Sequence, residues 1–159
     1  MKHIILIGFM GAGKSTMGKL IANKLGWRFI DTDAYIEKKE GRSIQDIFTD
    51  DGEDYFRSAE TDVLRELLEA DEKYVLALGG GTPLLEENRV LLKEAEAYVI
   101  FLKVNAKDAY ERLKDDVTRP LLQGTDVKQK IEILLQMRNP THRGNRPYQR
   151  SHNYWDGKP

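Results

Sequence analysis

The sequence predicts an α/β fold in three layers, with helices on both sides of a central parallel sheet of about five strands. Short apolar runs alternate with helical patterns along most of the chain. The run at 74–78 is continuously apolar, which is typical of a strand buried on both faces. A chain of 159 residues with 40% hydrophobic content is long enough for one core, so we expect a single domain over 1–159.

The patterns place the elements as follows. Strands are predicted at 3–7, 27–30, 74–78 and 97–104. Helices are predicted at 14–25, 34–40, 44–48, from Gly52 to about 68, 86–94, 106–113 and 127–137.

The first helix follows a short strand and a glycine-rich loop. Its apolar residues are expected to face the core, and Gly26 is expected to end it. These apolar residues are Met17, Leu20, Ile21 and Leu25.

The next strand, 27–30, runs into Asp31, Thr32 and Asp33, and the helix after it ends before Gly41. Ser43 is a preferred N-cap residue and starts a short helix. The longer helix after Gly52 carries an apolar face at helical spacing. This face consists of Phe56, Ala59, Val63, Leu64, Leu67 and Leu68.

The strand at 74–78 ends in three glycines, 79–81, before the helix at 86–94, the strand at 97–104 and the helix at 106–113. Residues 114–126 have weak periodicity and are expected to form a lid at the surface. The polar segment 140–159 shows no pattern for the fifth strand and closing helix that such a sheet requires.

Composition excludes several classes of function. Lys plus Arg total 25 against 26 Asp plus Glu, so the net charge of −1 offers no overall field for nucleic acid or a membrane surface. The absence of cysteine excludes a disulfide scaffold, a thiolate metal site and a cysteine nucleophile. The first apolar run is too short for a signal or membrane-spanning segment, and we expect a cytoplasmic protein.

The loop after the first strand carries a phosphate-binding motif. Gly8, Gly13, Lys14 and Ser15 match G-x-x-x-x-G-K-[ST], in which the loop amides point at one anion. The Lys14 ammonium would contact the β- and γ-phosphates, and the Ser15 hydroxyl would bind Mg²⁺. The helix that starts here also turns its positive end toward the phosphates. The sequence therefore predicts nucleotide binding.

Two more polar motifs follow strands. In a parallel sheet, ligands bind beyond the carboxyl ends of the strands, where Asp31, Asp33 and the glycines 79–81 are expected. Two carboxylates beside a phosphate loop suggest one near Mg²⁺ and one that orients an acceptor hydroxyl. They could equally cap the next helix. The glycines could admit a ligand close to the backbone, or simply form a tight turn.

Taken together, these motifs resemble shikimate kinases over about residues 1–140. The matching segments are Gly8 to Thr16, Asp31-Thr32-Asp33, Phe56-Arg57 with Glu60, Gly79-Gly80-Gly81, and Arg119-Pro120-Leu121-Leu122. Beyond Pro140 the chain departs from the family pattern, which places a short strand and a final helix there.

The resemblance implies a nucleoside-monophosphate-kinase-like P-loop fold and ATP-dependent phosphorylation of the 3-hydroxyl of shikimate, in aromatic amino-acid biosynthesis. It implies ATP binding by Gly11, Ala12, Gly13, Lys14, Ser15 and Thr16, with Arg119 on the lid and Arg112 beside the adenine. Mg²⁺ would be held by Ser15 and Asp31. The catalytic residues would be Asp33, Lys14 and Arg119.

For the acceptor, the resemblance implies that Arg57 and Arg138 bind the carboxylate, that Glu60 orients Arg57, and that the glycines 79–81 line the ring. Two arginines on one carboxylate make physical sense, since a planar guanidinium pairs bidentately with a planar anion. From the sequence alone, Arg119 could instead be a solvated surface residue, and Arg138 could complement a helix dipole.

Alternatives from other classes stay open at this point. One is another sugar-acid or polyol kinase such as a gluconate kinase, which shares the loop. Another is a non-catalytic ATP-binding protein with a degenerate C-terminus. A GTPase is not supported, because Asn105-Ala106-Lys107-Asp108 has the letters of the guanine motif in the wrong order. We expect a monomer with ATP and a small acceptor as its only partners.

Overall fold

The computed structural model describes residues 2–9 and 12–114. Its strands are β1 (His3–Gly8), β2 (Arg28–Asp31), β3 (Tyr74–Ala77) and β4 (Ala97–Leu102). Its helices are α1 (Lys14–Leu25), α2 (Thr32–Glu40), α3 (Ile44–Glu69), the 3-10 turn η1 (Thr82–Leu84), α4 (Glu86–Glu94) and α5 (Ala106–Leu113). The predicted bounds of α1, α4 and α5 are confirmed.

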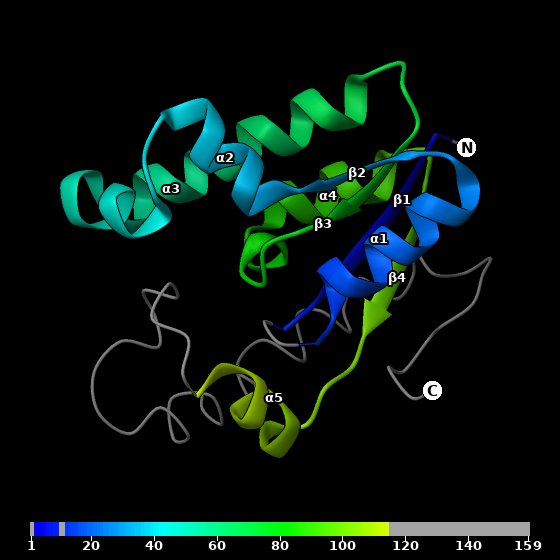
Figure 1. The fold of residues 1–159 in the computed structure, drawn as a ribbon. Helices are drawn as coiled ribbons and strands as arrows, with labels where there is room; N and C mark the ends of the chain where they lie inside the picture. The colour runs from blue at the N-terminus through cyan, green and yellow to red at the C-terminus, as the bar shows by residue number, and fades with distance from the viewer. Residues whose placement is uncertain (1, 10–11, 115–159) are drawn as a thin grey trace.

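The four described strands form one parallel sheet in the order β2-β3-β1-β4. Strand β1 lies between β3 and β4 (Figure 1). Its residue His3 pairs in register with Tyr74 of β3 and with Ala97 of β4. The carboxyl ends of β1, β2 and β3 therefore open at the same edge, where the three polar motifs follow. The sequence predicts about five strands, and any fifth strand falls beyond the described residues.

Helices cover both faces of the sheet, as predicted. Successive side chains of a strand point to opposite faces. Ile5 and Ile7 pack into the main core with residues of α3 and α4, whereas Leu6 lies beside Gly18 of α1. The fold is therefore an α/β/α arrangement, in which α1 and the α3–α4 pair lie on opposite sides.

The buried face of α1 differs from the predicted one. Leu20 and Leu25 are 54% and 46% exposed, and the helix buries Gly18 and Ala22 instead. A methyl group on Gly18 would stand 2.9 Å from a ring carbon of Phe29, so the close approach of this helix to the sheet requires a residue without a side chain. The expectation that all the leucines face the core was wrong, because small residues make this contact.

Most element ends follow local signals. The helices α1 and α2 end at Gly26 and Gly41, and the Ser43 hydroxyl accepts a hydrogen bond from the Asp46 amide (3.1 Å) at the start of α3. Gly52 was expected to separate two helices. This is confirmed: α3 consists of two helical segments separated by a break at Gly52, whose φ of 87° and ψ of 173° are a conformation that glycine adopts without a steric penalty.

The predicted lid at 114–126, the helix at 127–137 and the segment 140–159 lie outside the described residues, apart from residue 114. In the part of the chain that is described, no helix combines the length and the apolar character that crossing a membrane requires.

His3 predicts a pH dependence of stability. Its ring is 1% exposed, stacks on Tyr74, and lies with Nε2 3.3 Å from the Leu68 carbonyl. Burial lowers the pKa of His3 below its ordinary value of 6.5. The unfolded chain therefore binds a proton that the folded chain resists, and stability falls as the pH drops below about 6.5.

The change that tests this is His3→Phe, which keeps a stacked ring and removes the titration. The free energy of unfolding in urea should fall less between pH 7.5 and pH 5.5 in the variant than in the original protein. The two decreases should differ by at most about 1.4 kcal/mol per pH unit. Equal acid losses in the two proteins would contradict the prediction.

Candidate active site

The phosphate loop connects β1 to α1. Gly13 precedes the helix with φ of 92°, a left-handed conformation, and no described side chain caps the first turn. The amino end of α1 is thus available to an anion. The Lys14 ammonium donates to the carbonyls of Gly8 (2.6 Å) and Phe9 (3.0 Å), so it lies against the loop that the motif assigns to phosphate.

The first glycine of the motif, Gly8, lies too close to β4 to carry a side chain. A Cβ on Gly8 would stand 2.5 Å from the carbonyl oxygen of Leu102 at the end of β4. Ala12 is buried and Thr16 is exposed, whereas Gly11 lies outside the described residues.

Ser15 and Asp31 meet across the sheet edge. The Ser15 hydroxyl donates to Asp31 Oδ2 at 2.8 Å. The other carboxylate oxygen, Oδ1, accepts from the Ala34 amide at 3.2 Å and caps α2. Asp31 therefore caps a helix and also lies beside the phosphate loop, while its place near Mg²⁺ stays a prediction. A hydroxyl and a carboxylate are oxygen ligands of the kind that Mg²⁺ prefers, so these residues fit the ion.

Thr32 fixes the start of α2 against β3. Its hydroxyl donates to the Ala77 carbonyl (3.3 Å) and accepts from the Gly79 amide (3.2 Å), and the side chain is 3% exposed. Asp33, the next residue, is thereby held in the first turn of α2 beside the glycines that follow β3.

Arg57 and Glu60 form a buried ion pair on α3. Arg57 Nη1 donates to Glu60 Oε1 at 2.7 Å, and the two side chains are 12% and 1% exposed. Burial alone would lower the pKa of the Arg57 guanidinium, but the charges and hydrogen bonds of Glu60 and Glu53 together outweigh it and raise that pKa. The second edge of the guanidinium, Nη2, has a long contact of 3.4 Å with the half-exposed Glu53. Arg57 and Glu60 are therefore in contact, and the role of Glu60 in orienting Arg57 toward an acceptor stays a prediction.

The glycines after β3 admit these side chains to the backbone. A Cβ on Gly79 would stand 2.6 Å from Asp33 Oδ1 and 2.8 Å from Glu60 Oε2. A Cβ on Gly81 would stand 2.6 Å from the guanidinium carbon of Arg57. The groups that approach Gly79 and Gly81 are thus the protein's own charged side chains, and the approach of a ligand to these glycines stays a prediction.

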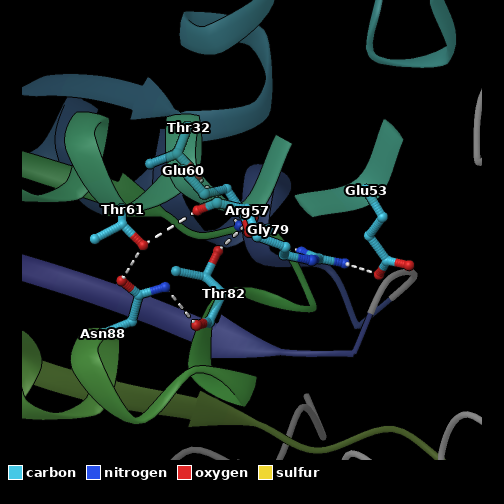
Figure 2. Close-up of polar contacts among 8 residues, drawn as sticks. All are labelled: Thr32, Glu53, Arg57, Glu60, Thr61, Gly79, Thr82 and Asn88. Atoms are coloured by element: carbon cyan, nitrogen blue, oxygen red, sulfur yellow. Dashed lines mark hydrogen bonds and ion pairs between the residues drawn. The ribbon is translucent and has the colours of Figure 1, made fainter. Parts of the chain in front are cut away.

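Figure 2 shows the result at one edge of the sheet: Arg57 extends across the glycine segment, with Glu60 behind it and Glu53 at its outer end. Asp33 shares Gly79 with Glu60, and Asp31, two residues before Asp33, contacts Ser15 of the phosphate loop. The structure thus brings together the phosphate loop, a carboxylate and a guanidinium, in that order.

The other predicted residues are placed as follows. Arg112 is exposed in the last turn of α5, and Gly80 is partly exposed between the two tightly packed glycines. Arg119 and Arg138 lie outside the described residues. Asn105 caps α5 by accepting from the Asp108 amide (2.8 Å), which explains the letters that resemble a guanine motif.

Sequence reasoning missed four buried polar residues around the site: Thr32, Thr61, Thr82 and Asn88. The only signal for Thr32 and Thr82 was their place next to the motifs, directly after a strand or a glycine run. Asn88 and Thr61 had no signal, because each lies inside a helix where a polar residue normally faces solvent.

Comparison with known proteins is consistent with this arrangement. The family model described as shikimate kinase matches residues 10–152. A shikimate kinase from Thermodesulfovibrio yellowstonii is 42% identical over 142 residues, covering 89% of this chain and 81% of that protein. A solved shikimate kinase from Acinetobacter baumannii in complex with shikimate has a TM-score of 0.87 at 41% identity, covering 91% of this chain and 80% of the other. A gluconokinase from Sinorhizobium meliloti, at 22% identity, TM-score 0.53 and coverage of 88% and 74%, shares the fold.

Proposed function

The chain belongs to the shikimate kinase family, and we propose that it transfers the γ-phosphoryl group of ATP to the 3-hydroxyl of shikimate. The enzyme phosphorylates shikimate in aromatic biosynthesis, and the products of this transfer are shikimate 3-phosphate and ADP. The observation that carries the residue assignments is the convergence of Asp33 and Arg57 on the glycines after β3, beside the phosphate loop.

ATP binds at the amino end of α1. Lys14 and the amides of residues 11–16 hold its phosphates, and the position of the Lys14 ammonium against the loop supports this assignment. Arg119 closes over the transferred group and stabilises its charge, while Arg112 flanks the adenine. These two roles rest on the family resemblance.

Ser15 and Asp31 hold Mg²⁺, with Asp31 acting through water. Their 2.8 Å contact, next to the phosphate loop, supports the pairing of these two oxygen ligands. The ion, when bound, neutralises the charge of the β- and γ-phosphate oxygens.

Asp33 accepts the hydrogen bond of the acceptor hydroxyl and takes its proton as transfer proceeds. The carboxylate lies in the first turn of α2, and Thr32 locks that turn onto β3. Such a rigid attachment suits a group whose contribution depends on its position.

Arg57 and Arg138 bind the carboxylate of the acceptor. Glu60 takes up the Nη1 edge of Arg57, which leaves the Nη2 edge to an anion able to displace the distant contact of Glu53. Because Glu53 is half-exposed and its contact with Arg57 is long, the displacement costs little.

The assay that tests the function couples ADP release to shikimate addition, with gluconate and other sugar acids or polyols as a panel. We expect turnover with shikimate far above that with every other acceptor. Higher turnover with gluconate would favour the sugar-acid kinase alternative, and ATP binding without any turnover would favour a non-catalytic ATP-binding protein.

We further propose that the enzyme works as a cytoplasmic monomer on small molecules, without nucleic acid or a membrane.

Substituting Gly81 tests the acceptor site separately. Its backbone angles, φ −91° and ψ −8°, suit alanine, and the three atoms nearest to an added Cβ all belong to the Arg57 guanidinium, so Gly81→Ala acts first on that group. We expect the displaced guanidinium to raise the KM for shikimate about tenfold, as for the loss of one charged hydrogen bond. The KM for ATP should stay within about twofold, and an unchanged shikimate KM would contradict the prediction.

A further inference from the structure

A continuous line of buried hydrogen bonds connects α4 to Arg57. Asn88 of α4 is fully buried, and its Nδ2 donates to the Thr82 carbonyl at 2.9 Å. The Thr82 hydroxyl donates to Glu60 Oε2 at 2.7 Å, and Glu60 Oε1 accepts from Arg57 at 2.7 Å. Figure 2 shows these contacts as one path from the helix to the guanidinium.

The path fixes the orientation of each group in it. The Thr82 carbonyl can only accept, so the amide nitrogen of Asn88 must face it. Asn88 Oδ1 then lies 2.8 Å from the Thr61 hydroxyl, which is also 3.1 Å from the Arg57 carbonyl. Each oxygen of Glu60 has a different donor, Thr82 on one side and Arg57 on the other. The Glu60 carboxylate therefore cannot rotate without losing a buried hydrogen bond, which is costly.

Thr82 also fixes the surface on which the guanidinium lies. It directly follows Gly81, over which the guanidinium packs, and its amide donates to the Gly79 carbonyl at 3.0 Å. One residue thus holds both the partner of Arg57 and the backbone beneath it.

Stability alone does not explain this arrangement. Buried polar and ionic groups can often be replaced by apolar groups of similar volume without loss of stability. What an apolar replacement cannot supply is a defined direction for a carboxylate and, through it, for a guanidinium. Glu60 holds Arg57 at Nη1, whereas Nη2 makes the outer contact with Glu53.

We propose that Thr82 and Asn88 are positioning residues for shikimate binding: they orient Glu60, which holds Arg57 at the angle that its pairing with the acceptor carboxylate requires. This proposal rests on the proposed role of Arg57 as the residue that binds that carboxylate.

The test is steady-state kinetics of the full chain with Thr82→Val, which keeps the shape and removes the donor, and with Asn88→Ala. Each should raise the KM for shikimate about tenfold, with kcat and the KM for ATP within about threefold of the original enzyme. Thr82→Ser, which keeps the hydroxyl, should restore the original KM.

Two controls separate positioning from a general loss of packing. Leu92→Ala removes a buried side chain from α4 one turn after Asn88 and should lower stability without raising the shikimate KM. In an Arg57→Ala background, Thr82→Val should raise the KM no further, because its effect acts through the guanidinium.

The outcomes are distinct even if Asn88→Ala does not fold, since Thr82→Val is nearly isosteric and Thr82→Ser removes only one methyl group. If Arg57→Ala raises the shikimate KM while Thr82→Val leaves it within twofold, the positioning proposal is wrong and the role of Arg57 stands. The same holds if Thr82→Val raises the shikimate KM further in the Arg57→Ala background. If Arg57→Ala itself leaves the KM unchanged, the proposed role of Arg57 fails.

Discussion

Replacing Asp33 with alanine is expected to lower kcat by more than about 100-fold while the KM for ATP changes little, in line with the contribution of a positioned general base. Asp33 sits beside Gly79, and the contact with Ser15 of the phosphate loop is made by Asp31, so the loss of Asp33 should leave the ATP site intact. Asp33→Asn, which keeps the size and removes the base, should be impaired to a similar degree. Coupled ADP-release kinetics measure both parameters.

Asp46→Ala is the matched control for this change. Asp46 lies in the first turn of α3 as Asp33 lies in the first turn of α2, and each stabilises its helix dipole. The control loses the same helix interaction and should keep full activity. A comparable loss of ATP binding in Asp33→Ala would contradict the role of a base.

Replacing Arg57 with alanine is expected to raise the KM for shikimate about 100-fold and to reduce kcat much less. A bidentate, charge-assisted pair with a carboxylate contributes about 3 kcal/mol, and most of it is present before the phosphoryl transfer. Arg57→Lys should recover only part of the affinity, because an ammonium lacks the planar pair of donors. Acceptor titrations at saturating ATP measure the effect.

Arg65→Ala provides the comparison on the same helix. Arg65 also has acidic partners, Glu87 at 2.6 Å and Asp62 at 3.5 Å, but its side chain is 41% exposed. Its loss should alter neither kinetic parameter, since exposed ion pairs contribute little. Equal effects of the two substitutions would show that Arg57 has no specific role in acceptor binding.

The sequence predicted the elements best where the signal was local. The bounds of α1, α4 and α5 and the ends at Gly26 and Gly41 follow from residues within one helical turn of each boundary. The side chains that face the core were less predictable: Leu20 and Leu25 fit a helical pattern, yet α1 packs through Gly18 and Ala22. Periodicity identifies a helix, whereas the distance between that helix and the neighbouring sheet decides which side chains fit in the contact.

By itself, the sequence determined the α/β class, the phosphate loop and the carboxylates after β2, because strand edges and helix caps depend on residues only a few positions apart. Only the tertiary structure decided why Gly79 and Gly81 are glycines, and that Thr82 and Asn88 belong with Glu60. Several of those contacts join residues that are 22 or more positions apart in the sequence. These residues lie on elements that come together only when the chain packs. A short segment of chain cannot encode them, since the partner of each buried polar group is chosen when α3 and α4 pack together.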